Sequence, residues 1–319
     1  MKRKRHIFGL ASVIGMVILI LDGKTAVAGA QAGIALCLKT VIPALFPFFV
    51  LSSLLLRDSG LPSKQNSGFP GIPAGMNVIL IPAFLGGYPV GAQVVSQEYR
   101  NGALSKKDAE RLLAFCSNAG PAFLFGMVGQ MFPEPWMAWA LWAIHIAGAL
   151  FAARCISNLR SHIRFEAHDS KKTSQDLLTC AVKTMGIVCG WIVLFRVVIA
   201  FLDRWVLWLF PSEARVAVIG LLELSNGCFE LAGISSVPIR FVLCSGMLAA
   251  GGLCVTMQTV SVTNGLSLRQ YFLGKLVQVL ISLILSISIQ LRTFIPLLFL
   301  LSLFLHFKKR CSNPAVSGV

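Results

Sequence analysis

Long apolar stretches separated by short polar segments run along almost the whole chain. They lie at about 7–21, 26–38, 41–56, 76–96, 111–130, 136–153, 177–202, 205–225, 238–262, 271–290 and 292–307. A helix needs about 20 apolar residues to cross the hydrocarbon core of a bilayer, and several of these stretches are shorter or contain glycine and proline. The pattern therefore predicts an all-α polytopic membrane protein with about eight to ten membrane segments, some of them re-entrant or broken.

The polar segments predict how the chain is divided. A basic start followed by a short apolar core predicts an N-terminal anchor span over 1–24. The same features are typical of a cleaved secretory signal, but we expect the span to be retained because the chain after it is also membrane-embedded. The one long hydrophilic segment predicts a linker over 157–176 between a first half, 25–156, and a second half, 177–290. A C-terminal segment with a basic tail, 291–319, follows.

Two distant segments read almost as copies of each other. GYPVGAQVVS at 87–96 is followed by NGALS, and GLCVTMQTVS at 252–261 is followed by NGLS. Shared membrane composition explains matching valines, but not glycine, glutamine and serine in the same register. We therefore expect the two halves to be related, inverted repeats, with a substrate site where the repeats meet.

The composition excludes a soluble protein, because 56% of the residues are hydrophobic, 13% are charged and the mean hydropathy is +0.77. A net charge of +15 would suggest nucleic acid as a partner in a soluble protein. Here the basic residues cluster at the ends of the apolar stretches, which is the positive-inside pattern and predicts cytoplasmic termini and a cytoplasmic linker. We expect the lipid bilayer as a partner and no nucleic acid.

Glu223 is the sharpest candidate for chemistry inside the membrane. It follows the apolar run VAVIGLL and precedes Ser225 and Asn226. Charged groups at membrane depth are costly and usually functional. On a helix, Glu223 and Asn226 would share a face, where the carboxylate could hold a proton, a sodium ion or a ligand hydroxyl. The alternative is a carboxylate at the membrane–water boundary with no ligand.

Two breaks rich in glycine or proline interrupt apolar runs of the first half. Non-helical backbone at membrane depth is tolerated where it faces protein or a water-filled cavity, so both breaks predict groups that bind a substrate. A kink or a close helix contact is the alternative. The first break supplies the candidates Gly87, Tyr88, Pro89, Gly91 and Gln93, and the second supplies Ser117, Asn118, Gly120 and Pro121. The second repeat segment adds the candidates Gln258 and Ser261.

Motifs of common enzymes are absent from the sequence. It contains no HExxH, GxSxG or Walker A pattern, so we do not expect an enzyme or an ATP-driven pump. The nine cysteines form no CxxC pair, and we expect no disulfide, no metal site and no cofactor. Transport would then be driven by an ion gradient, with H⁺ or Na⁺ as the coupling ion, or would run downhill.

Several segments resemble a known family. PFFVLSSLL, GGYPVGAQ, NGALSKKDAERLLAFCSNAGPAF and GLLELSNG are similar to the nucleoside-recognition (Gate) domain family, in particular to its sporulation integral membrane protein branch. The likeness runs from about residue 30 to 290. It implicates Gly87, Tyr88, Pro89, Gly91, Ser117, Asn118, Gly120, Pro121, Glu223, Ser225 and Asn226. Two departures are that Gln93 stands where much of the branch is expected to carry lysine, and that the chain is shorter than expected for the branch.

The resemblance implies a fold distantly similar to concentrative nucleoside transporters, whose repeats contain re-entrant hairpins. Its sporulation branch is associated with moving dipicolinic acid across the outer forespore membrane. We therefore expect a secondary transporter or permease, in the cell or forespore membrane, for a nucleoside-like compound or an aromatic dicarboxylate such as dipicolinate. The alternative is a non-transporting structural membrane protein of the sporulation machinery. We expect the protein partners to be further copies of this chain or other sporulation membrane proteins.

Overall fold

The computed structural model describes residues 2–57, 77–156 and 174–292, and all regular elements within these ranges are helical. Most of the linker expected at 157–176 and almost all of the C-terminal segment expected at 291–319 lie outside the described residues. The apolar run expected at 292–307 lies outside them as well, except for its first residue.

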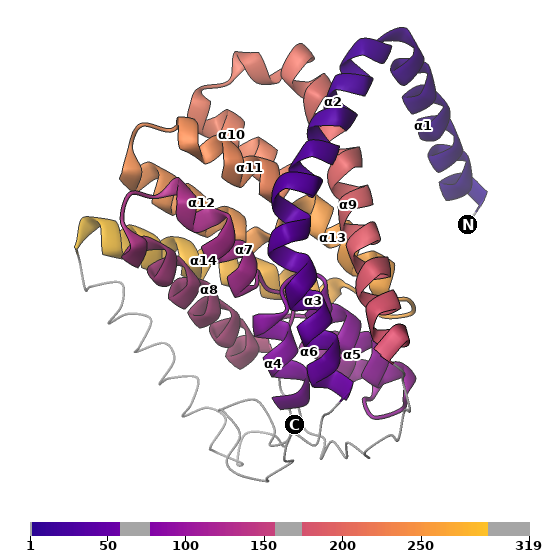
Figure 1. The fold of residues 1–319 in the computed structure, drawn as a ribbon, viewed down its shortest axis with the longest axis vertical. Helices are drawn as coiled ribbons and strands as arrows, with labels where there is room; N and C mark the ends of the chain where they lie inside the picture. Colours follow the sequence, from indigo (N-terminus) through magenta and orange to yellow (C-terminus); the bar gives the residue numbers. More distant parts are fainter. Residues whose placement is uncertain (1, 58–76, 157–173, 293–319) are drawn as a thin grey trace, which may run out of the picture.

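Fourteen α-helices and four short helical turns make up the described ranges (Figure 1). In chain order they are α1 (Lys2–Leu21), α2 (Gly23–Leu36), η1 (Cys37–Val41), α3 (Ile42–Arg57), α4 (Asn77–Leu85), α5 (Val90–Arg100), α6 (Lys106–Leu112), α7 (Pro121–Gly126), η2 (Val128–Met131), α8 (Pro135–Ile156), α9 (Ser174–Trp205), η3 (Leu207–Leu209), α10 (Ser212–Leu222), α11 (Leu224–Glu230), η4 (Leu231–Gly233), α12 (Val237–Ala250), α13 (Gly252–Val262) and α14 (Arg269–Leu291).

Five helices within the described ranges are long and apolar enough to cross a membrane. They are Gly23–Leu51, Pro135–Ile156, Leu178–Trp205, Val237–Val262 and Arg269–Leu291. The runs expected at 26–38 and 41–56 thus join into one helix through the π-helical turn η1. In the expected anchor, the apolar part of α1 is the shorter helix Ser12–Leu21. The helical content and these five helices agree with the expected polytopic membrane protein.

Two of the remaining apolar runs fold back on themselves as helical hairpins. In the first, a Cβ on Gly91 of α5 would overlap the Cys116 carbonyl oxygen, between α6 and α7, and would come within 2.9 Å of the Ala83 Cα of α4. In the second, α10 and α11 lie closer still, and a Cβ on Gly227 would overlap the backbone of Gly220. Glycine is needed at these contacts because any side chain would push the packed backbones apart.

The same order of elements occurs twice along the chain. A long helix, a hairpin, an interrupted pair of helices and a second long helix follow one another as α2–α3, α4–α5, α6–α7 and α8, and again as α9, α10–α11, α12–α13 and α14. The two hairpins lie toward opposite ends of the long axis, with α4 and α5 near the bottom of Figure 1 and α10 and α11 in its upper part. The hairpin tips point toward the middle of the molecule, where both contribute to one cavity.

The two similar sequence segments lie in different kinds of element. Residues 87–96 form the tip and second arm of the hairpin α4–α5, whereas 252–261 lie in α13, the second part of the helix Val237–Val262. Their local backbone is nevertheless alike, because Gly87 and Gly252 have φ of 75° and 78°, and Gly102 and Gly265 in the following turns have φ of 80° and 86°. These left-handed values favour glycine. The glycines shared by the two segments therefore occupy turns with similar backbone conformations.

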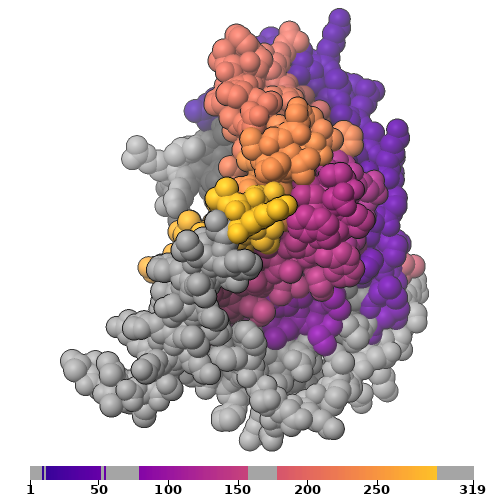
Figure 2. Space-filling view, turned by 90° about the vertical axis from the view of Figure 1, so that its left-hand side faces the viewer, coloured from indigo at the N-terminus to yellow at the C-terminus, as the bar shows by residue number. Residues whose placement is uncertain are grey.

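The core joins both halves of the chain. Helix α14 packs along α8 and α12, and Figure 2 shows α14 (yellow) beside orange and magenta segments on one face. Gly274 of α14 lies directly against the Ala114 backbone, so the last described helix runs close to the segment between α6 and α7. This contact positions the second break predicted from the sequence.

Candidate functional site

A partly open cavity of about 30 Å³ lies where the hairpin tips meet the interrupted helices. Each of the two series of elements lines it with a long helix, a hairpin tip and an interrupted pair. The lining residues are Val41, Leu45, Gly87, Tyr88, Gly120, Phe123, Val188, Ile192, Glu223, Leu224, Ser225, Val255 and Gln258. The walls are thus mostly apolar, with a few polar groups, as is usual for small-molecule sites.

The tip of the second hairpin places a carboxylate in this cavity. Glu223 separates α10 from α11, has an extended backbone and is only 2% exposed. Its Oε1 accepts a hydrogen bond from the Ser225 backbone N–H at 3.0 Å, and its Oε2 accepts from the backbone N–H and the side-chain amide of Asn226, both at 2.6 Å. The carboxylate therefore caps the first turn of α11.

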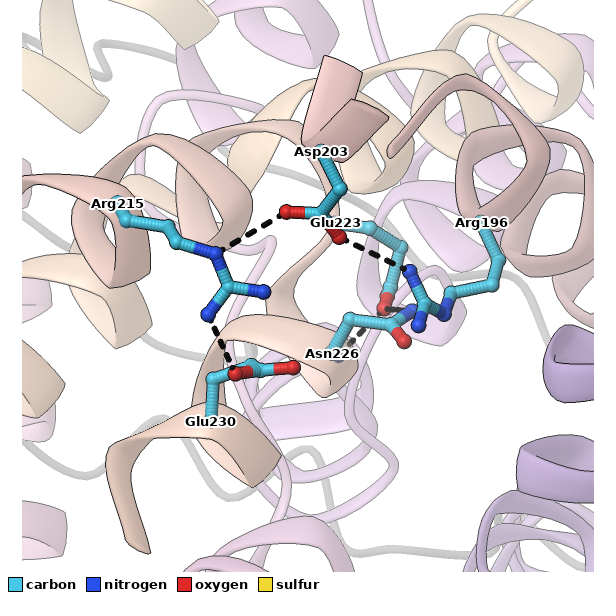
Figure 3. Close-up of polar contacts among 6 residues, drawn as sticks. All are labelled: Arg196, Asp203, Arg215, Glu223, Asn226 and Glu230. Atoms are coloured by element: carbon cyan, nitrogen blue, oxygen red, sulfur yellow. Dashed lines mark hydrogen bonds and ion pairs between the residues drawn. The ribbon is translucent and has the colours of Figure 1, made fainter. Parts of the chain in front are cut away.

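No ion pair among the described residues includes Glu223. The nearby charges pair with one another instead (Figure 3). Arg215 of α10 lies 3.0 Å from both Asp203 of α9 and Glu230 of α11, and Arg196 lies 3.8 Å from Asp203. These partly exposed pairs tie the outer ends of the hairpin arms to α9. The Glu223 carboxylate, by contrast, accepts hydrogen bonds from Ser225 and Asn226.

The tip of the first hairpin lines the same cavity as Glu223. Tyr88 is 8% exposed, and its hydroxyl donates a hydrogen bond to the Leu248 carbonyl of α12 at 2.9 Å. Gly87 touches Gly120, because a Cβ on Gly120 would lie 2.9 Å from the Gly87 Cα. The two breaks predicted from the first half of the sequence thus meet at these glycines.

The second break is held by buried polar groups of α8 and α14. The His145 Nε2 accepts a hydrogen bond from the Ala119 backbone N–H at 3.0 Å. The Gln278 side-chain amide donates to the Asn118 Oδ1 and to the His145 carbonyl, both at 3.1 Å. The exposed fractions of Asn118, His145 and Gln278 are 1%, 2% and 0%, so these bonds fix the break deep in the protein.

Lys275 is the buried cation of this network and is 6% exposed. Its ammonium group donates to the Ser117 carbonyl at 2.5 Å, to the Gln278 Oε1 at 3.0 Å and to the Tyr88 hydroxyl at 3.4 Å. It also lies 5.1 Å from the centre of the Tyr88 ring. Lys275 therefore links α14 to both breaks of the first half.

The structure brings six of the fourteen candidates from the sequence to the cavity. These are Gly87, Tyr88, Gly120, Glu223, Ser225 and Gln258. Ser117, Asn118 and Asn226 support these groups from behind through the hydrogen bonds described above. Pro89 and Pro121 flank the breaks, and Gly91 lies at the contact between the hairpin arms.

Two of the candidates face α9 and not the cavity. Gln93 donates to the Cys180 Sγ at 3.3 Å and accepts from the Thr184 hydroxyl at 3.3 Å. The exposed Ser261 accepts a hydrogen bond from the Trp191 indole N–H at 3.2 Å. Residues that match in the two sequence segments thus have different surroundings, since Gln258 lines the cavity and Gln93 does not.

Sequence reasoning missed Lys275, Gln278 and His145. The signal for the first two was present, because a lysine and a glutamine three residues apart interrupt the apolar run at 271–290 on one helix face. His145 stands alone in its run, and nothing in the sequence shows that its ring reaches the Ala119 backbone. Within the described ranges no cluster of three His, Cys, Asp or Glu side chains could hold a metal ion.

The arrangement can hold a small polar molecule through few groups. Among the lining residues, Glu223 has hydrogen-bond acceptors, Gln258 has both a donor and an acceptor, and Tyr88 is aromatic. The lining includes no lysine or arginine. These groups therefore suit hydrogen bonding to a neutral ligand better than the pairing of an anion.

The chain is 23% identical to the sporulation integral membrane protein YlbJ of Bacillus subtilis (strain 168), over 78% of this chain and 73% of that protein. No protein-family model matches the chain, and no solved structure matches it. The likeness to a sporulation integral membrane protein is thus confirmed, whereas the Gate domain stays a prediction from the sequence. The chain is similar to a membrane protein of spore formation.

Proposed function

We propose that the protein is a secondary transporter or permease that binds a small polar metabolite between its two hairpin tips. The observation that carries the proposal is the cavity to which both hairpins, both interrupted helix pairs and two long helices contribute. Broken helices at the meeting point of two repeats are where many secondary transporters bind their substrates. The doubled order of elements supports an inverted repeat, with the site on its internal axis.

The cavity requires movement before it can take a metabolite. Its volume of about 30 Å³ suits a few water molecules, whereas drug-sized ligands occupy about 300 Å³ or more. The tips must therefore separate during each cycle, and the hairpins are suited to this because each is a short unit. The pairs of Arg215 with Asp203 and Glu230 hold the outer ends of the second hairpin, so its tip can move about a fixed base.

The polar groups of the cavity favour a neutral substrate. A dianion such as dipicolinate would face the Glu223 carboxylate without a cation among the lining residues, so it would need accompanying protons or a cation. A nucleoside-like compound could bind through hydrogen bonds to Gln258 and Glu223 and through contact with Tyr88. Similarity to YlbJ supports a role in spore formation, which keeps dipicolinate as the second compound to test.

Two glutamines offer a matched pair of variants for the test. Gln258→Leu removes an amide from the cavity, and Gln93→Leu removes one that contacts α9. The full chain would be reconstituted in proteoliposomes, and uptake of labelled nucleosides and of dipicolinate would be measured in parallel. We expect Gln258→Leu to lower uptake about tenfold, the effect of losing one hydrogen bond of about 1.4 kcal/mol, and Gln93→Leu to retain uptake.

The competing function is a structural membrane protein of the sporulation machinery. Such a protein would need the fold but no polar cavity, and it would tolerate Gln258→Leu as well as Gln93→Leu. Absence of uptake of both compound classes by well-folded wild-type protein, together with normal spore formation by the Gln258→Leu strain, would contradict the proposal.

A further inference from the structure

We propose that the ammonium group of Lys275 is a tethered cation, which occupies an oxygen cage beside the 117–120 break and replaces a bound alkali ion there. The cage concerns the elements of the proposed transport site, but the inference does not depend on transport. It predicts that the contact between the two breaks of the first half, near Gly87 and at 117–120, does not depend on sodium.

The first support is the number and geometry of the ligands. An ammonium group has three donors and no acceptor. Lys275 has three oxygen partners, the Ser117 carbonyl, the Gln278 Oε1 and the Tyr88 hydroxyl, at 2.5, 3.0 and 3.4 Å. All three donors are thus used, and the Tyr88 ring adds a cation–π contact.

The second support is that the cage is electrically neutral. No ion pair among the described residues includes Lys275. A buried cation is usually paired with a carboxylate, but here a carbonyl, an amide and a hydroxyl oxygen surround it. Backbone carbonyls of an unwound helix and neutral side-chain oxygens are also what transporters use to hold a sodium ion. The cage therefore has the chemistry of a monovalent cation site.

The third support is that further hydrogen bonds fix the side chains that form the cage. The Tyr88 hydroxyl donates to the Leu248 carbonyl, which leaves its oxygen free to accept from Lys275. The Gln278 amide donates to Asn118 and to the His145 carbonyl, so its oxygen must point toward Lys275. Such fixed partners are expected of a built site and not of a lysine buried by chance.

The cage also reaches the cavity through Tyr88, because this residue lines the cavity. One charge thus bridges the tip of the first hairpin, the second break and α14. If an alkali ion did this work, the fold of these elements would depend on its concentration. A covalently attached ammonium group removes that dependence.

The test measures thermal stability of the purified full chain in detergent, in NaCl, KCl and choline chloride at equal ionic strength. The wild-type protein should melt at the same temperature in the three salts. Lys275→Ala empties the cage and should melt several degrees lower in choline chloride, with a dose-dependent recovery in NaCl. Lys275→Ser adds a hydroxyl oxygen to the cage and should show the same recovery, so it replaces the alanine variant if that one aggregates.

Lys275→Met is the matched control, because its side chain fills the cage without charge. It should be destabilised equally in all three salts. A sodium-specific rise in the melting temperature of the wild-type protein would overturn the proposal. Equal melting temperatures of the alanine or serine variant in all three salts would overturn it as well. These readouts require no substrate, so they remain valid even if the proposed transport activity is absent.

Discussion

At the scale of single residues, two buried ionisable side chains of this protein have uncharged partners. Glu223 is surrounded by N–H groups and Lys275 by oxygens, and neither forms an ion pair with another described residue. The sequence was sufficient to single out Glu223 as a candidate, because this carboxylate directly follows a long apolar run. The same rule applied to α14 would have found Lys275. No rule of sequence separates Gln258 from Gln93, because only the folding of the helices decides which amide meets the cavity.

Glu223→Gln tests the account of the carboxylate. Both carboxylate oxygens accept hydrogen bonds, so a glutamine must turn its NH₂ group toward a donor of Ser225 or Asn226. We expect a loss of about 1–3 kcal/mol in the free energy of unfolding, seen as a lower melting temperature. Glu230→Gln, at the partly exposed far end of α11, should have a smaller effect. Equal losses in the two variants would contradict the assigned hydrogen bonds.

At the scale of elements, the apolar runs predicted the positions of the long helices, but they did not predict which interruptions become hairpins. The runs at 136–153 and 271–290 correspond to α8 and α14. The breaks expected near Gly87 and Ser117 do interrupt the helices, whereas the break at Glu223 was not predicted because Glu223 was expected to lie on a helix. Local sequence also does not distinguish a kink from a hairpin. That choice depends on close contacts between arms, such as the one between Gly220 and Gly227. In α12–α13 a similar glycine turn interrupts one long helix instead.

Gly227→Ala tests the second hairpin. A Cβ at this position would overlap Gly220, so α10 and α11 must separate, and we expect a loss of about 1–3 kcal/mol in stability. Gly186→Ala on α9 is the matched control, since a Cβ there meets nothing within 4 Å and alanine favours the helix. Thermal unfolding in detergent measures both. A Gly227→Ala variant as stable as Gly186→Ala would show that the arms do not pack in this way.

At the scale of the whole molecule, the two hairpins approach the cavity from opposite ends of the long axis. The basic residues of α6 lie at the end of the first hairpin, and the positive-inside pattern puts that end in the cytoplasm. The start of α10 should then face the opposite side. A similar series of elements in each half is what an inverted repeat would produce, although the matching sequence segments did not identify which elements correspond.

Cysteine labelling tests this orientation. Lys107→Cys and Ser212→Cys place thiols at exposed positions of α6 and α10. A membrane-impermeant thiol reagent added outside intact cells should label Ser212→Cys and spare Lys107→Cys until the cells are opened, with the unsubstituted chain as background. Labelling of both variants from outside would contradict the inverted arrangement.

The central claim is that the substrate passes through the cavity between the hairpin tips. It is tested most directly by a substitution that fills this cavity with a larger side chain. Val188 of α9 lines the cavity and is 3% exposed, whereas Val198 of the same helix is 40% exposed. Uptake of nucleosides and dipicolinate would be compared in proteoliposomes containing Val188→Phe or Val198→Phe, each at equal reconstituted amount and after a melting curve has shown it to be folded. The account predicts that Val188→Phe abolishes the uptake seen with wild-type protein and that Val198→Phe leaves it unchanged. Wild-type uptake by folded Val188→Phe would show that the substrate does not pass between the hairpin tips.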